Sequence, residues 1–104
     1  MSPDPLSPDP VKVAIVLPGA LDELGGRSSS VQLELPAGAR VRDALDALET
    51  QLPRVARRIR DETGTVRRHV NLYVDGDDVR TIQGQDTRLP DGASILVLPS
   101  VAGG

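Results

Sequence analysis

Apolar residues follow two different periods along the chain, and each period predicts one kind of element. Residues 11–17, 31–35, 70–74 and 94–98 are rich in β-branched residues and leucine and either run continuously or alternate with polar residues, which is typical of strands. Between these runs, apolar residues instead recur at every third or fourth position, at Val41, Ala44, Leu45, Leu48 and Leu52. This spacing predicts an amphipathic helix.

Turn-forming residues set the connections between these segments. The first two strands are expected to form an antiparallel hairpin, and Pro53 either ends the helix or opens a second short turn. Asp75-Gly76-Asp77 predicts a hairpin turn into a short strand at 78–80. The order strand, strand, helix, strand, short strand, strand predicts an α+β domain, with one main helix packed on one face of a mixed sheet of four to five strands.

The other face of this sheet is expected to stay uncovered. If alternate residues of 70–74 and 95–97 point toward the helix, then Tyr73, Leu96 and Leu98 point away from it. An apolar patch on an open face is a candidate contact surface for a partner. The alternative is an ordinary scatter of exposed apolar side chains.

Composition limits how this domain is built. The 104 residues are enough for one domain. Residues 1–10 hold four prolines and two aspartates, so we expect a disordered leader, followed by the folded domain at 11–100 and a flexible tail at 101–104. The chain has no phenylalanine, tryptophan or cysteine, and Tyr73 is its one aromatic residue. Aliphatic side chains must therefore supply the core, and disulfides and thiolate chemistry are excluded.

Charge is unevenly distributed. The formal net charge is −3, which argues against general binding to nucleic acid, yet six of the twelve cationic residues lie between 54 and 68. Either this segment is a solvated arginine-rich helix or it contacts an acidic protein partner. No apolar run is long enough to span a bilayer and residues 1–10 lack the features of a signal peptide, so no membrane contact and a cytoplasmic location are expected.

The polar residues do not predict an active site. His69 is the single histidine, and one histidine without cysteine does not make a typical metal site. Asp75, Asp77 and Asp78 lack the spacing and the closing glutamate of a calcium loop. We therefore expect a protein that is not an enzyme and holds no metal.

The last four residues are the strongest functional signal. The sequence ends in Val101-Ala102-Gly103-Gly104, directly after the final predicted strand. Two residues without a Cβ adopt almost any backbone angle and pass through a slot too narrow for side chains. The group delivered in this way is the carboxylate of Gly104. The alternative is a frayed terminus without a role.

Several segments together resemble the ubiquitin-like sulfur-carrier family, which includes the small subunit of molybdopterin synthase and the thiamine-biosynthesis sulfur carrier. The resemblance covers residues 11–104 and is strongest in 70–80, in Leu89-Pro90-Asp91-Gly92 and in 95–104. The ending Leu-Pro-Ser-Val-Ala-Gly-Gly is most similar to the actinobacterial cysteine-biosynthesis carriers. The resemblance implies a β-grasp fold.

It also implies a chemical role. A ubiquitin-activating-like enzyme would use ATP to adenylate Gly104, and a sulfurtransferase or persulfide donor would convert the adenylate to a thiocarboxylate. Gly103 would let the tail enter the partner, Val101 and Ala102 would position it, and Tyr73, Leu96 and Leu98 are candidate contacts on the folded domain. The sulfur would pass to a cysteine-synthase-like or other sulfur-accepting enzyme. No cofactor is expected to be bound by the chain itself.

Three other roles stay open at this point. The chain could be a subunit of molybdopterin synthase, a protein modifier that forms isopeptide bonds through Gly104, or a binding module with an inert tail. Several family members have a phenylalanine at the partner surface, which this chain lacks. Lys12 is its only lysine, which argues weakly against chains built on the protein itself.

Overall fold

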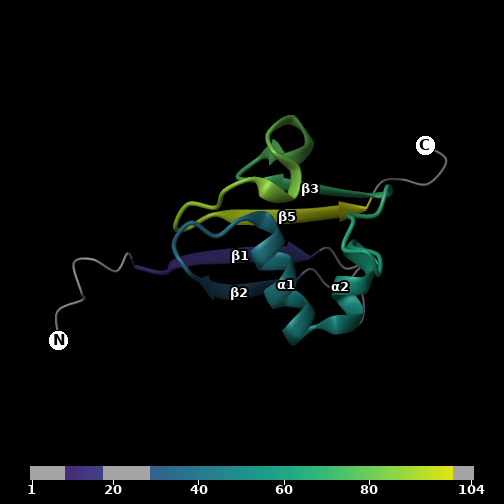
Figure 1. Ribbon diagram of the computed structural model, residues 1–104, viewed down its shortest axis with the longest axis horizontal. Helices are drawn as coiled ribbons and strands as arrows, with labels where there is room; N and C mark the ends of the chain where they lie inside the picture. The colour runs from purple at the N-terminus through teal and green to yellow at the C-terminus, as the bar shows by residue number, and fades with distance from the viewer. Residues whose placement is uncertain (1–8, 18–28, 100–104) are drawn as a thin grey trace.

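The computed structural model describes residues 9–17 and 29–99, and in these residues five strands form one sheet with helices on one face (Figure 1). The strands are β1 (Val11–Leu17), β2 (Ser29–Leu35), β3 (Val70–Val74), β4 (Asp77–Asp78) and β5 (Ser94–Pro99). The helices are α1 (Val41–Gln51) and α2 (Pro53–Ile59), and two 3-10 helices, η2 (Val79–Thr81) and η3 (Gly84–Asp86), follow β4.

The order of strands in the sheet is β2-β1-β5-β3-β4. β1 and β2 form the predicted antiparallel hairpin, with Val11 opposite Leu35 and Leu17 opposite Ser29. β5 lies in the middle, parallel to β1 and antiparallel to β3. A mixed sheet with its helices on one side is the β-grasp arrangement, so the predicted fold class is confirmed.

The core lies between the sheet and the helices. The inward residues of the strands alternate as predicted, and α1 contributes Val41, Ala44, Leu45 and Leu48, all of which are buried. α2 adds Val55, Ala56 and Ile59. Aliphatic side chains make up this cluster of buried apolar residues, so the absence of aromatic residues does not prevent a closed core.

Local chemistry explains where α1 and α2 begin. Asp43 Oδ2 accepts a hydrogen bond of 2.8 Å from the backbone N–H of Arg40 and so holds the chain at the entry to α1. Pro53 stands at the first position of α2, where its missing N–H costs nothing. Both possibilities left open at Pro53 are correct, because α1 ends at Gln51, just before it, and a second short helix begins at Pro53.

The short strand predicted at 78–80 is present but lies at 77–78, and the prediction of strand at 79–80 is wrong. β4 ends at Asp78, whose Oδ1 accepts a hydrogen bond of 2.9 Å from the backbone N–H of Arg80, and this contact starts η2. The turn before it is as predicted, since Asp75 and Gly76 both have positive φ, at 49° and 93°. β5 also extends one residue beyond its predicted end, to Pro99.

Candidate functional site

Three apolar side chains form a row across the face of the sheet that the helices leave open. Tyr73 in β3 lies opposite Leu96 in β5, and Leu96 lies beside Val16 in β1. Opposite residues of an antiparallel pair have Cβ atoms about 4.5–5.5 Å apart, which makes Tyr73 and Leu96 direct neighbours on this face, and the parallel pairing places Val16 on the other side of Leu96. All three are partly exposed, whereas their neighbours Leu72, Val74, Ile95 and Val97 are buried on the helix side. The predicted orientation of Tyr73 and Leu96 is confirmed.

Leu98 continues the apolar surface toward the end of β5. Its exposed fraction is 37%, which makes it one of three large apolar residues that are exposed in the described part of the chain. It lies opposite Asn71, whose Oδ1 accepts a hydrogen bond of 2.6 Å from Arg80 Nη2. We call Val16, Tyr73, Leu96 and Leu98 the open-face patch.

The patch has a fixed polar border beside Tyr73. Arg80 Nη2 lies 3.0 Å from Asp78 Oδ2, and Asp78 is the β4 residue opposite Tyr73. The hydrogen bond from the Arg80 side chain lowers the pKa of Asp78, and the same contact raises the pKa of Arg80. Both groups are therefore charged across the neutral range, which separates a polar edge from the apolar row.

Sequence reasoning missed one member of this patch. The pattern of residues 11–17 predicts a strand, but it does not identify Val16 as a candidate contact residue. The strand register places Val16 between Leu96 of β5 and Ser30 of β2, on the same face as Ala14 and Lys12. Only the pairing of β1 with β5, which are far apart in sequence, shows that Val16 and Leu96 are neighbours.

The residues predicted to carry the chemistry, Val101, Ala102, Gly103 and Gly104, lie outside the described residues. The point from which they begin is defined, because Ser100 is bonded to Pro99 and Pro99 lies opposite Val70. Five residues span at most about 18 Å when extended. Any protein that holds Gly104 must therefore lie close to the end of β5.

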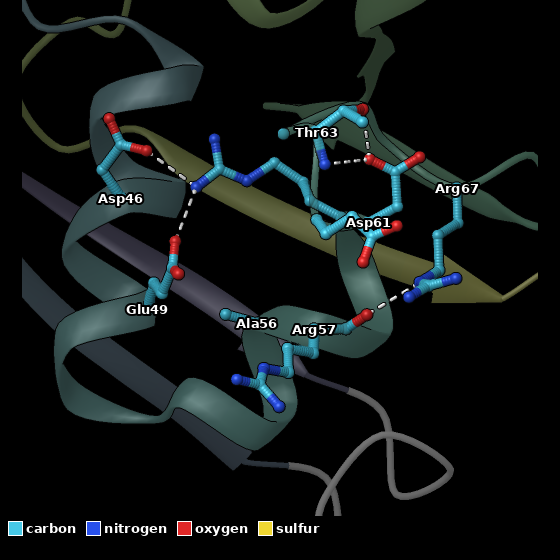
Figure 2. A pocket seen from close by; sticks show the side chains of 10 residues that line it. Asp46, Glu49, Ala56, Arg57, Asp61, Thr63 and Arg67 are labelled. Atoms are coloured by element: carbon cyan, nitrogen blue, oxygen red, sulfur yellow. Dashed lines mark hydrogen bonds and ion pairs between the residues drawn. The ribbon is translucent and has the colours of Figure 1, made fainter.

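A polar hollow of about 720 Å³ lies on the helix side, between α1, α2 and the loop that follows α2 (Figure 2). Arg60 Nη2 lies in it, 2.7 Å from Asp46 Oδ1 and 3.4 Å from Glu49 Oε2, while Nη1 donates to Gln85 Oε1. The Arg60 side chain is only 10% exposed. The Arg60 guanidinium therefore already has hydrogen-bond and ion-pair partners within the protein.

The loop beside the hollow is held by Asp61. Its Oδ1 accepts hydrogen bonds from the Thr63 hydroxyl and from the backbone N–H groups of Thr63 and Thr65, and the Thr63 hydroxyl contributes most to lowering the pKa of Asp61. These contacts are internal to the loop. The polar side chains around the hollow are therefore accounted for by their role in holding the loop, and they do not by themselves indicate a bound ligand.

Two simple classes of site find no support in the structure. Residues 9–17 and 29–99 contain no group of three or more histidine, aspartate or glutamate side chains placed to hold a metal ion. Within the same residues, no helix is both long and apolar enough to cross a membrane.

Comparison with known proteins agrees with this arrangement. Residues 15–104 match the ThiS family. The sulfur carrier protein CysO of Mycobacterium tuberculosis is 32% identical over 96 residues, which cover 90% of this chain and all of that protein. The crystal structure of M. tuberculosis CysO has a TM-score of 0.69 at 30% identity and covers 86% of this chain and 99% of that one.

Two further proteins extend the comparison. The small archaeal modifier protein 3 of Haloferax volcanii is 37% identical over 75 residues, 72% of this chain and 80% of that protein. A chain of the crystal structure of the Amycolatopsis orientalis BexX/CysO complex has a TM-score of 0.65 at 30% identity, and the match covers 88% of this chain and 99% of that one. The similarity therefore includes both a sulfur carrier and a protein modifier.

Proposed function

The chain belongs to the ThiS family of ubiquitin-like sulfur carriers, and we propose that it carries sulfur as a thiocarboxylate on Gly104 for cysteine biosynthesis or a related sulfur-incorporating pathway. The observation that carries this proposal is the match to the family through Gly104, together with full coverage of the mycobacterial sulfur carrier. The protein itself then acts as a co-substrate of other enzymes and not as an enzyme.

The chemistry follows from the carboxylate. A terminal carboxyl has a pKa of about 3.5, so it is ionised and unreactive toward sulfur nucleophiles at neutral pH. Attack of a Gly104 oxygen on the α-phosphorus of ATP releases pyrophosphate and leaves an acyl adenylate. Attack of sulfide on its carbonyl carbon then releases AMP and leaves the thiocarboxylate. With a persulfide donor, the resulting acyl disulfide needs a thiol reductant to release the donor.

The folded domain must provide much of the binding energy. Ordering the tail costs about 1–2 kcal/mol for each residue in backbone entropy, so four tail residues are a poor handle by themselves. The open-face patch offers apolar area close to the start of the tail, since Leu98 directly precedes Pro99. We therefore assign docking on the adenylating enzyme to this patch. The solved BexX/CysO complex shows that a similar protein forms a complex with a partner, which supports this assignment.

The decisive experiment changes the length of the tail. Adding one alanine after Gly104 moves the carboxylate by about 3.3–3.6 Å, and a misplacement of 1 Å can cost about 100-fold in rate. We expect the extended variant, and the variant without Gly104, to lose ATP–pyrophosphate exchange with the adenylating enzyme while their melting curves match the wild type. Ser100→Ala is the control, because it alters the tail without changing its length.

Intact mass spectrometry gives a second readout. After incubation with the adenylating enzyme, ATP and a sulfur source, the wild-type chain should contain one sulfur in place of one oxygen at Gly104. If the alanine-extended variant exchanges pyrophosphate at the wild-type rate, the terminal-carboxylate mechanism is wrong. The inert-tail binding module is then the better interpretation.

The similarity to small archaeal modifier protein 3 favours one second candidate, a protein modifier. It would use the same adenylate, but a lysine Nζ of a target protein would attack the carbonyl carbon and release AMP. Covalent adducts of this chain with other proteins in its native host would identify this role. Their absence from cells in which the thiocarboxylate is found would exclude it.

A further inference from the structure

We propose that a second docking surface, made of arginines on α2 and in the loop before β3, binds an acidic surface of the enzyme that adenylates Gly104. We call it the arginine cluster, and it consists of Arg54, Arg57, Arg58, Arg67 and Arg68. The inference rests on the proposed function, because it names the chemistry of the partner at the base of the same tail.

The cluster opposes the charge of the rest of the protein. Residues 54–69 contain six arginines and two acidic residues, whereas the remainder of the chain contains six cationic and thirteen acidic residues. The excess of positive charge is thus concentrated in one short segment of a protein whose net charge is −3. A local field of this kind attracts a complementary acidic surface and raises the rate of association.

These arginines form no ion pair within the described part of the chain. α2 buries Val55, Ala56 and Ile59 and leaves its arginines exposed on the opposite side. The ion pairs among residues 9–17 and 29–99 involve the arginines at 40, 42, 60 and 80, and none involves a member of the cluster. Arg60 is therefore the exception in its segment. Besides the Thr63 hydroxyl, the charge of Arg67 also helps to lower the pKa of Asp61, while the other four arginines of the cluster keep their charge available.

The backbone joins α2 to the segment beside it. Arg67 Nε donates a hydrogen bond of 2.7 Å to the backbone carbonyl of Arg57, which Figure 2 shows at the edge of the hollow. The backbone N–H of Arg67 also donates to the carbonyl of Ile59. The arginines of α2 and Arg67 therefore form one surface, and Arg68 adjoins it as the next residue of the chain.

This surface lies at the end of the sheet from which the tail begins. Val70, two residues after Arg68, lies opposite Pro99, the last described residue of β5. In Figure 1, α2 lies at the same end of the sheet as the end of β5. Because the tail spans at most about 18 Å, an enzyme that holds Gly104 must cover this end, where it meets both Leu98 and the arginine cluster.

The experiment compares two variants, each of which lacks three arginine charges, at opposite ends of the sheet. The cluster variant carries Arg54→Gln, Arg57→Gln and Arg58→Gln, and it keeps Arg67 because that side chain holds the loop. The control variant carries Arg40→Gln, Arg42→Gln and Arg88→Gln. Its residues lie near the start of β5. The backbones of Arg40 and Arg88 pair in an isolated antiparallel β-bridge, and residues 88–93 lead into β5.

Two measurements use the adenylating enzyme from the same genome. Pyrophosphate exchange gives the carrier concentration for half-maximal rate, and biolayer interferometry without ATP gives binding alone. We expect the cluster variant to need about tenfold more carrier at about 0.05 M salt, with an unchanged rate at saturation, and the control variant to behave as the wild type. At about 0.5 M salt, the wild type should approach the cluster variant, because exposed charges are then screened.

Three results would overturn the proposal. The first is equal weakening of both variants, which would show an effect of net charge alone, and the second is a cluster variant that binds as tightly as the wild type. The third is binding of the wild type to duplex DNA that the cluster variant loses, which would assign the surface to nucleic acid. Failure of the proposed function is a different result, in which the wild type binds the enzyme without any pyrophosphate exchange.

Discussion

The two faces of the sheet use the same strands for opposite purposes. On the helix side, Ile15, Leu72, Ile95 and Val97 are almost fully buried beneath α1 and α2. On the other side, Val16, Tyr73, Leu96 and Leu98 occupy the alternate positions and stay partly exposed. A strand period of two thus places a core and an apolar surface one residue apart, and only the first is required for folding.

The charged groups of the helix side also fall into two kinds. Arg60 is enclosed by carboxylates of α1 and by Gln85, while the arginines of the cluster are exposed and form no ion pair in the described residues. Groups that hold the fold together are saturated with internal partners. Groups that we assign to binding are left without them, and the comparison therefore predicts separable defects.

The largest effect should come from adjacent residues of β5. Ile95→Ala removes a fully buried side chain from the central strand, so we expect the free energy of unfolding to fall by about 2–5 kcal/mol. Leu96→Ala removes a partly exposed member of the row and should cost less than about 1 kcal/mol, the typical contribution of a cross-strand pair. Urea unfolding of both variants measures the difference. Equal losses would show that the open-face row belongs to the core.

The next effect concerns binding and not stability. Tyr73→Ala should raise the carrier concentration for half-maximal pyrophosphate exchange roughly thirtyfold, as truncation of a buried interface tyrosine does, and Leu98→Ser should raise it less. The rate at saturation should survive, because the tail chemistry is unchanged. Gln32→Ala is the control, because it removes a polar side chain from β2 on the same open face of the sheet but outside the open-face patch. A normal half-maximal concentration for Tyr73→Ala would place docking elsewhere.

The elements that depend on local pattern could be predicted from the sequence. Spacing of three and four residues located α1, and alternation located β3 and β5 together with the direction in which Tyr73 and Leu96 point. Asp75-Gly76 predicted its turn because both positions need positive φ. In each case the necessary interaction lies within a few residues of the pattern.

Other features depend on contacts that the pattern does not contain. Val79 was assigned to a strand, but the side chain of Asp78 bonds the N–H of Arg80 and turns the chain into η2. Arg60 was counted with the exposed arginines, although it lies against Asp46 and Glu49, which are 14 and 11 residues away on another helix. In the first case, a side-chain hydrogen bond replaces the backbone pairing of a strand. In the second, ion pairs within the protein replace the hydration of an exposed arginine.

Only part of the candidate site could be predicted from the sequence. Tyr73, Leu96 and Leu98 were named from alternation alone, while Val16 needed the parallel pairing of β1 with β5. The tail residues Val101 to Gly104 were named from composition and from a family resemblance, and their role stays a prediction. Periodicity identifies which side of a strand is exposed, but the neighbouring strand decides which exposed residues form one surface.

The smallest effect should come from Arg60→Met, which tests whether the helix side is held by packing or by charge. Methionine replaces most of the aliphatic volume of the arginine but not its ion pairs. The partners Asp46 and Glu49 are 64% and 62% exposed, so water screens these contacts, and we expect a loss of only about 1 kcal/mol in the free energy of unfolding. Arg42→Met is the control, because both side chains of its ion pair with Asp86 are about half exposed and the pair should contribute almost nothing.

Adenylation should be unaffected in both variants, since neither residue belongs to the open-face patch or the arginine cluster. If Arg60→Met unfolds the protein or abolishes exchange at saturation, the ion pairs around Arg60 do more than join α1 to α2, and the division between groups that hold the fold and groups that bind a partner fails.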